Sequence, residues 1–341
     1  MRHPSRPATR AQRVAFALAL ASAICLTLAP TSSATKYAGA FLESGFGGGI
    51  GARASGMGNA FVSIANDGSA GYWNPAGMVL VRHRETTAMH AERFGSLVNY
   101  DAFGYVQVQN AQRKHRSAFG FSVIRSGVDD IPFTHQDTIS VSPLILRNQV
   151  DRYESWSEWG FLFSYGRLLR DDISVGGSVK VIYKAIDADN AIGFGFDLAA
   201  IARPWRALSV GVLLQDATST ILIWDGRTET ISPTAKLGAS YPFKVPFSGT
   251  LVLAADVDTR FEGRDFAAQA STGTVSGDFH LGAEYWYREL LSLRLGSDEG
   301  SFTAGAGFRF PLGYRSIGLD YAFLQHNDLD DSHRVSALFK F

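Results

Sequence analysis

Alternation between apolar and polar residues along short segments is the feature that most constrains what this chain can fold into. In the last segment, Val335, Ala337 and Phe339 fall on one face of an extended strand, while Arg334 and Ser336 fall on the other. Successive side chains of a strand point to opposite faces, so this segment has one apolar and one polar face. Repeated around a closed sheet, the pattern gives a β-barrel with an apolar belt toward lipid and a polar wall toward its lumen.

Fourteen segments have the character of strands in such a barrel. Their number is even, as in single-chain bacterial barrels that keep both chain ends on the periplasmic side. We therefore expect an all-β membrane fold, a 14-stranded antiparallel transmembrane β-barrel that occupies residues 83–341. The expected strands are approximately 84–94, 99–109, 117–126, 155–168, 171–186, 190–203, 206–216, 230–241, 248–260, 276–289, 290–298, 300–311, 314–325 and 332–341.

The lengths of the connections support this number of strands. With the N-terminus in the periplasm, the odd-numbered connections are the outer loops, and the long connections at 127–154, 217–229, 261–275 and 326–331 are all odd-numbered. The even-numbered connections are mostly short, as periplasmic turns of barrels are. A count wrong by one strand would place long loops at both ends of the barrel.

Residues 1–34 are expected to be a secretory signal peptide. Four arginines form a basic start, an apolar run from Val14 to Ala29 follows, and small residues ending at Ala34 suit cleavage. The alternative, an N-terminal membrane anchor, is disfavoured because the apolar run is short and ends at Pro30. We therefore expect export and integration into the bacterial cell outer membrane.

Charge and cysteine content exclude several classes of protein. The chain has 32 basic and 32 acidic residues, and removal of the four arginines in 1–34 leaves a small acidic excess, so no surface for nucleic acid is expected. The single cysteine, Cys25, lies in the expected signal peptide, which leaves no cysteine catalysis after cleavage. The histidines lack metal-ligand spacing, and no HExxH or P-loop motif occurs. We expect no enzyme, no catalytic residues, no cofactor and no metal.

Charged residues of both signs fall on the faces expected to line the lumen. Such a wall suits an open porin, but it also suits a barrel that holds a plug, because charges shielded from bulk water need partners. The expected lumen-facing charges are Lys180, Asp197, Lys236, Asp256, Asp258, Glu284, Arg294, Arg309 and Asp320.

Residues 35–82, between the signal peptide and the first strand, are rich in glycine and do not alternate. Glycine permits close packing and positive φ where a chain threads a confined space. An Asn-Asp-Gly sequence at 66–68 predicts a turn, and Asn74 followed by Pro75 predicts the start of a short helix. We expect an N-terminal hatch of turns and short helices that folds into the barrel and blocks it. The candidate hatch residues are Gly51, Arg53, Gly56, Gly58, Asn59, Asp67, Asn74, Pro75 and Gly77.

Two of these residues have specific expected roles. Arg53 is expected to pair with an inward acid, either Asp256 or Glu284, because a charge enclosed by the barrel needs a counter-charge. Asn74 is expected to fix the turn that seats the hatch. Both roles are structural rather than catalytic.

Several segments of the chain carry a family resemblance. They include Gly-Ala-Arg at 51–53, Gly-Met-Gly-Asn-Ala-Phe at 56–61 and Trp-Asn-Pro-Ala-Gly at 73–77, and others between 280 and 336. Together they resemble the PorV/PorQ family of outer-membrane barrels, which are related to the FadL long-chain fatty-acid transporters. The resemblance covers essentially the whole chain after residue 34 and implies a 14-stranded barrel with an N-terminal hatch.

Two functions follow from this resemblance. PorV-type members imply a non-enzymatic component of protein secretion or surface assembly, of the type IX kind, with secreted cargo proteins and secretion machinery as partners. The alternative is a FadL-like transporter of hydrophobic small molecules across the outer membrane. For the secretion function, cargo is expected to dock at the outer loops 127–154 and 217–229. For the transport function, the apolar stretches at 131–133 and 141–146 could line a ligand pocket. Alternatively, these stretches pack on the rim of the barrel. In both cases the barrel is surrounded by outer-membrane lipid.

Overall fold

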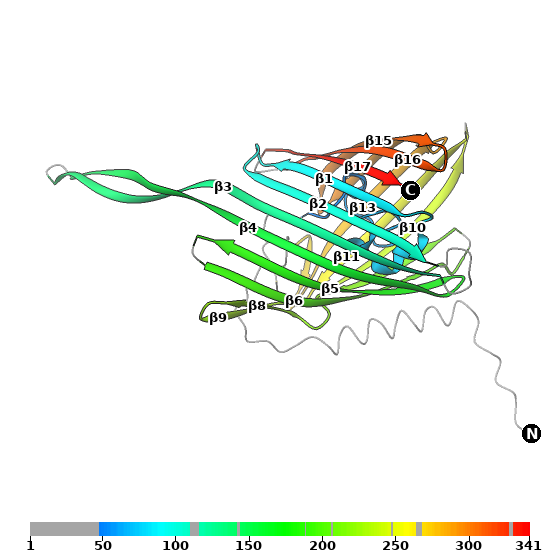
Figure 1. The fold of residues 1–341 in the computed structure, drawn as a ribbon, viewed down its shortest axis with the longest axis horizontal. Coiled ribbons are helices and arrows are strands. Elements are labelled where there is room, and N and C mark those ends of the chain that lie inside the picture. The colour runs from blue at the N-terminus through cyan, green and yellow to red at the C-terminus, as the bar shows by residue number, and fades with distance from the viewer. Residues whose placement is uncertain are drawn as a thin grey trace, which may run out of the picture.

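The computed structural model describes residues 48–109, 116–141, 144–187, 189–205, 207–246, 248–263, 268–326 and 330–341. The expected signal peptide and the beginning of the expected hatch lie outside these residues. In the described part, the strands join into one closed sheet that surrounds a set of short helices (Figure 1).

Seventeen strands form this sheet in the described part of the chain. They are β1 (Glu85–Arg93), β2 (Val98–Gln109), β3 (Ser117–Val141), β4 (Leu144–Arg170), β5 (Ile173–Ile186), β6 (Asp189–Ala202), β7 (Ser209–Gln215), β8 (Thr220–Trp224), β9 (Arg227–Ile231), β10 (Thr234–Val245), β11 (Gly249–Arg260), β12 (Ala270–Thr272), β13 (Val275–Tyr287), β14 (Leu291–Asp298), β15 (Ser301–Leu312), β16 (Arg315–Leu324) and β17 (Ser332–Lys340).

The wall of the barrel has fourteen antiparallel strands, as expected. It closes where β17 pairs with β1, from Glu85 opposite Lys340 to Glu92 opposite His333. β7 and β8 both pair with β6 and form one interrupted wall strand, and β9 and β10 form the next one. β12 is a short outer strand that pairs with β13. The connection expected at 217–229 therefore contains β8 and the first residues of β9. The expectation of a long loop there was wrong.

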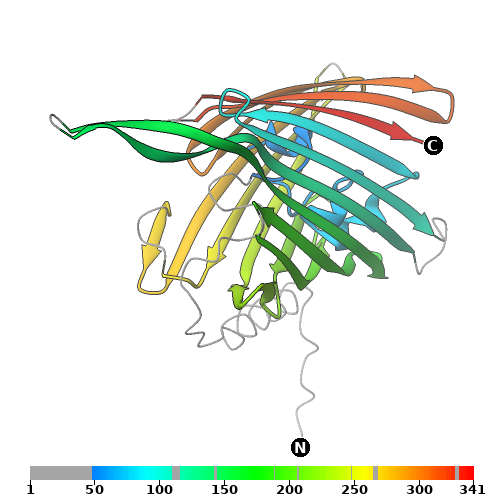
Figure 2. The ribbon, with the colours of Figure 1, turned by 60° about the vertical axis from the view of Figure 1, so that its left-hand side comes forward.

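The connection expected at 127–154 is instead a two-stranded ribbon. β3 and β4 stay paired out to Val141 opposite Leu144, and the ribbon projects from the barrel in Figures 1 and 2. β2 accompanies β3 only to Gly127, and β5 accompanies β4 only from Trp156. Beyond these residues both faces of the ribbon meet the same surroundings, so apolar–polar alternation no longer marks the strands.

The apolar side chains of the wall point outward and the polar side chains point inward. Leu293 is 64 % exposed, whereas its neighbour Arg294 is 1 % exposed. In β6, Phe194 and Phe196 are exposed while Asp197 is buried. An apolar outer face this broad is unfavourable in water and is what a barrel presents to lipid. Among the described residues, no helix is both long enough and apolar enough to cross a membrane.

Three short helices of the N-terminal segment lie inside the barrel. They are α2 (Ala52–Ser55), α3 (Ala70–Trp73) and the 3-10 helix η1 (Pro75–Leu80), and Figure 2 shows them in blue within the ring of strands. Met57, Phe61 and Met78 are fully buried here, so the apolar core lies between this segment and the inner wall. Residues 48–82 are called the hatch below.

Candidate functional site

The hatch and the wall meet so closely that two glycines are required at the contact. Gly282 of β13 faces Met57, and a Cβ on Gly282 would overlap the Met57 carbonyl oxygen. On the hatch side, Gly58 has a φ of 60°, and a side chain there would strike the carbonyl oxygen of Ser297. Only glycine combines this backbone conformation with this approach. The hatch is therefore seated backbone against backbone on β13 and β14.

The other candidate glycines of the hatch have distinct positions. Gly51 precedes α2 as its N-cap residue. Gly56 lies against Gly305 of β15, where a Cβ on Gly56 would be 3.1 Å from the Gly305 Cα. Gly77 packs inside the hatch on the carbonyl group of Ala65.

Arg53 joins the hatch to the wall through a bidentate ion pair. Its Nε and Nη2 atoms donate to the two carboxylate oxygens of Glu284, both at 2.8 Å. Its Nη1 atom donates to Asn66 Oδ1 at 2.7 Å and to Asp67 Oδ2 at 3.2 Å. Burial opposes the charged form, but the charge and hydrogen bonds of Glu284 outweigh it, and the pKa of Arg53 lies above its usual value. Of the two acids expected to pair with Arg53, the structure selects Glu284.

Glu284 continues this pairing into the wall. Arg294 Nε donates to Glu284 Oε1 at 2.8 Å, and Arg294 Nη1 donates to Asp320 Oδ1 at 2.8 Å. Arg309 Nη2 donates to Asp320 Oδ2 at 2.6 Å. The result is a buried chain of alternating charges, called the Arg53 network below. Because each carboxylate lies between two arginines, the chain has a counter-charge at every position.

Asp256 and Asp298 of the wall also bind the hatch. Asp256 of β11 accepts a hydrogen bond from the backbone N–H of Val62 at 2.8 Å. Asp298 of β14 accepts one from Asn59 Nδ2 at 2.7 Å. Asp256 is therefore a hydrogen-bond acceptor for the hatch backbone rather than the ion-pair partner of Arg53.

His280 links Asp298 to the neighbouring strands. Its Nδ1 atom lies 2.8 Å from Asp298 Oδ1, and its Nε2 atom lies 3.7 Å from Asp258 Oδ2. Asp258 is in turn paired with Lys236 of β10. The predicted inward charges Lys236 and Asp258 thus form part of a second buried cluster beside the hatch.

Arg334 and Ser336 of β17 hold the start of the hatch. Arg334 Nη1 donates to the carbonyl oxygen of Gly49 at 2.8 Å and to Ser55 Oγ at 2.9 Å. Ser336 Oγ accepts from the backbone N–H of Ala52 at 2.9 Å. Both side chains lie on the face of the last strand that alternation predicts to be polar, but neither is among the candidate residues predicted from the sequence.

Asn74, Pro75 and Asp67 shape the hatch itself. Asn74 Oδ1 accepts from the N–H of Ala76 at 3.0 Å and caps η1, in which Pro75 is the first residue. Asn74 Nδ2 donates to the carbonyl oxygen of Val62 at 2.9 Å. Asp67 Oδ1 accepts from the N–H of Ser69 at 3.0 Å. Asn74 therefore caps η1 and ties its start to the turn at Val62.

Lys180 and Asp197 serve a different part of the lumen. Lys180 Nζ lies 2.8 Å from Asp197 Oδ1 and 2.7 Å from Asp216 Oδ1. Asp216 follows β7, at the interruption before β8, and its backbone N–H donates to Asp197 at 2.8 Å. These charges stabilise the interrupted wall strand rather than the hatch. Asp216 was missed because it lies where the strand pattern breaks.

The site is therefore a hatch held in a lumen by ion pairs and backbone contacts. Within the residues that the structure describes, no group of three or more His, Cys, Asp or Glu side chains is arranged to hold a metal ion. The chemistry available here is closure of the lumen through paired charges and buried apolar side chains.

Comparison with known proteins bears on the fold. No family model and no curated protein matches the chain, so the PorV/PorQ resemblance rests on the sequence motifs alone. Among solved structures, the chain is similar to the Pseudomonas putida toluene transporter TodX, with 14 % identity, a TM-score of 0.55, and coverage of 85 % of this chain and 97 % of that one. A TodX mutant described as a monoaromatic hydrocarbon channel gives 12 % identity, a TM-score of 0.52, and coverage of 85 % and 98 %.

A Pseudomonas aeruginosa FadL homologue also matches, with 12 % identity, a TM-score of 0.44, and coverage of 82 % of this chain and 94 % of that one. At these identities the comparisons with TodX show the fold. The chain therefore has the fold of TodX, a closed 14-stranded antiparallel β-barrel, with its N-terminal segment folded into short helices.

Proposed function

We propose that this chain is a channel for hydrophobic small molecules in the bacterial outer membrane. The observation that supports the proposal is a 14-stranded barrel of TodX type whose lumen holds a hatch built from its own N-terminal segment. A wide aqueous pore would need an unobstructed lumen, whereas a hatch with an apolar core suits solutes that leave water readily.

The side chains buried at the centre of the hatch are of the kind that such solutes would contact if the hatch moved. Phe61 and Trp73 meet edge to face, with ring centroids 5.9 Å apart, and Met57 and Met78 are buried in the same cluster. Aromatic faces and thioethers are polarisable and adapt to irregular apolar shapes. Compact aromatic hydrocarbons and acyl chains are therefore the substrate classes that we expect, and their passage requires the hatch to move from the wall.

Uptake measurements test this proposal. The wild-type protein is produced in a bacterial host that lacks its own channel for hydrophobic compounds, and uptake of radiolabelled toluene, oleate and sucrose is compared with that of the empty host. We expect faster uptake of toluene or oleate and unchanged uptake of sucrose. Equal uptake of all three compounds with and without the protein would contradict the proposal.

A second measurement tests protein secretion as the competing function. The tagged protein is purified under gentle conditions from its own outer membrane, and the bound proteins and lipids are identified by mass spectrometry. We expect a barrel with apolar compounds. Recovery of secreted proteins together with secretion machinery, and no transport of apolar compounds, would favour the secretion role that the PorV/PorQ resemblance implies.

A further inference from the structure

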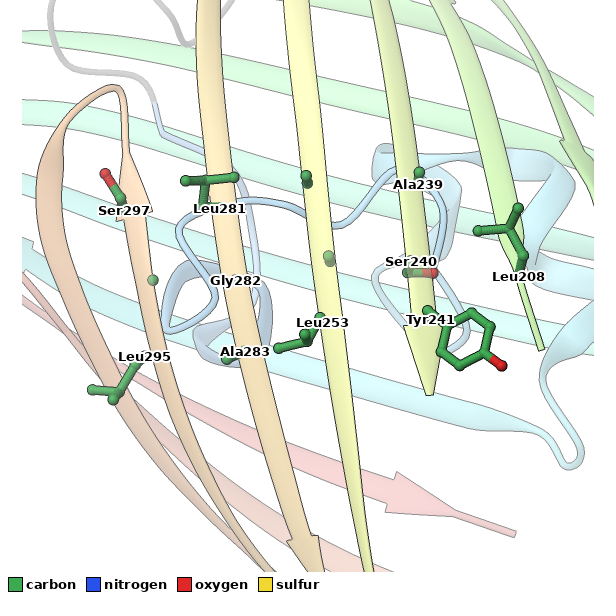
Figure 3. A pocket seen from close by; sticks show the side chains of 13 residues that line it. Leu208, Ala239, Ser240, Tyr241, Leu253, Leu281, Gly282, Ala283, Leu295 and Ser297 are labelled. Carbon is green, nitrogen blue, oxygen red and sulfur yellow. The ribbon is translucent and has the colours of Figure 1, made fainter. Parts of the chain in front are cut away.

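A groove lies on the outer face of the wall, on the opposite side of the backbone from the hatch. It has a volume of about 580 Å³ and is lined mainly by residues of β10, β11, β13 and β14 (Figure 3). Pockets for small ligands range from about 300 to 1,000 Å³. The groove is wide open on its outer side, so its volume suits an elongated apolar chain that lies along the wall.

One edge of the groove is a row of side chains across four strands. Tyr241, Leu253, Ala283 and Leu295 are register partners in succession. Leu253 and Leu295 stand out from the wall as exposed side chains, whereas Ala283 between them is only partly exposed. The outer surface of the wall is therefore lower at Ala283, which has only a methyl group where Leu253 and Leu295 on either side have larger side chains.

A second row two residues away completes the groove. Ala239, Ala255 and Leu281 are successive register partners on β10, β11 and β13. The two alanines add a low floor, and Leu281 rises beside them as an exposed rim. Figure 3 shows Ala239 on β10 and Leu281 on β13, with the ribbon of the hatch behind the wall.

The groove lies near the short-turn end of the barrel. Tyr241 is four residues from the end of β10 at Val245, and Leu253 is four residues from the start of β11 at Gly249. Four strand residues span about 13 Å, or roughly 10 Å along the membrane normal for a strand tilted by about 40°. Short turns mark the periplasmic end of such barrels. The groove therefore faces the hydrocarbon of the periplasmic leaflet.

We propose that the groove binds one acyl chain of a phospholipid of the periplasmic leaflet. It is continuous with the apolar belt, since Leu237, Phe279 and Leu293 are exposed around it. The thirteen residues that line it include no lysine or arginine. A free fatty acid would find no counter-charge there, whereas a phospholipid keeps its headgroup at the water interface while its chain fills the groove. The proposal depends on the membrane location and is independent of the transport function.

Native mass spectrometry of the purified protein tests this assignment. The detergent-solubilised barrel is titrated with 1-palmitoyl-2-oleoyl-phosphatidylethanolamine, and the lipid-bound fraction is measured. The double variant Ala255→Leu/Ala283→Leu fills the groove. The matched control Ala88→Leu/Ala337→Leu adds the same atoms at two outward alanines that face each other on β1 and β17.

We expect one bound lipid for the wild type and the control, and affinity about tenfold weaker for the groove variant, because at least two methylene groups lose their burial. Equal lipid binding by all three proteins would overturn the proposal. Binding of sodium oleate in place of the phospholipid, lost only in the groove variant, would assign the groove to free fatty acids instead. If the double variant does not fold, Ala239→Leu fills the same floor from β10.

Discussion

Arg53 of the hatch and Glu284 of β13 form a bidentate ion pair, with both N···O distances at 2.8 Å, although 231 residues separate them in the sequence. Glu284 is shared with Arg294, and Arg294 with Asp320. The hatch is therefore bonded to a rigid network of the wall rather than to one flexible side chain. Any movement of the hatch away from β13 must separate Arg53 from Glu284.

Substitution of Arg53 should loosen the hatch without unfolding the wall. In Arg53→Gln, Glu284 keeps Arg294 but loses the counter-charge of the hatch, and we expect a loss of about 3 kcal/mol of stability. Thermal unfolding followed by circular dichroism, together with conductance in planar bilayers, measures the effect. We expect a lower unfolding midpoint and a higher conductance.

The matched control is Arg84→Gln, since Arg84 is an exposed arginine directly before β1. This variant should behave like the wild type, because an exposed arginine contributes little. If Arg53→Gln also kept the wild-type midpoint and conductance, the ion pair would not hold the hatch.

The sequence was sufficient to predict two candidate partners of Arg53 but not to choose between them. Alternation identified Asp256 and Glu284 as inward-facing acids, and both do contact the hatch. Alternation gives the face of a strand but not the height at which the hatch crosses it. Only the folded path of residues 48–82 decides that Val62 meets Asp256 and that Arg53 meets Glu284.

Two other features escaped prediction for separate physical reasons. The ribbon of β3 and β4 projects beyond the barrel wall, where its two faces no longer meet different surroundings, so the pattern that marks a strand is lost. Arg334 binds the carbonyl oxygens of Gly48 and Gly49, and backbone acceptors leave no signature in the residue types. The fourteen wall strands were predictable because each of them separates an apolar surrounding from a polar one.

Glycine at 282 should be necessary for seating the hatch. In Gly282→Ala the new methyl group would overlap the carbonyl oxygen of Met57, so the hatch must shift and we expect a loss of about 2 kcal/mol. The control is Gly277→Ala in the same strand, where the nearest atom lies 3.9 Å from the added Cβ. Thermal unfolding of the two variants distinguishes them. Equal thermal unfolding midpoints of the two variants would mean that Met57 of the hatch does not pack closely against Gly282 of β13.

Asn74 should contribute through both of its polar atoms. Asn74→Ala removes the cap of η1 and the donor to the Val62 carbonyl oxygen, and we expect a loss of about 2 kcal/mol. Asn74→Asp keeps the acceptor for the Ala76 N–H but loses the donor and buries a charge, so it should be at least as destabilising. Asn99→Ala, at a partly exposed wall position, should change stability by less than about 0.5 kcal/mol. Recovery of full stability by Asn74→Asp would show that the cap alone matters.

The ribbon should be dispensable for the barrel. Residues 132–153 can be replaced by an Asn-Gly turn that joins Ile131 to Glu154, which are register partners. The strands of the wall keep their neighbours, because β2 and β5 do not pair with the removed segment. We expect the thermal midpoint to stay close to that of the wild type and toluene uptake to persist. A barrel that no longer folds would show that the ribbon stabilises the wall, and loss of uptake from a folded barrel would place substrate capture on the ribbon.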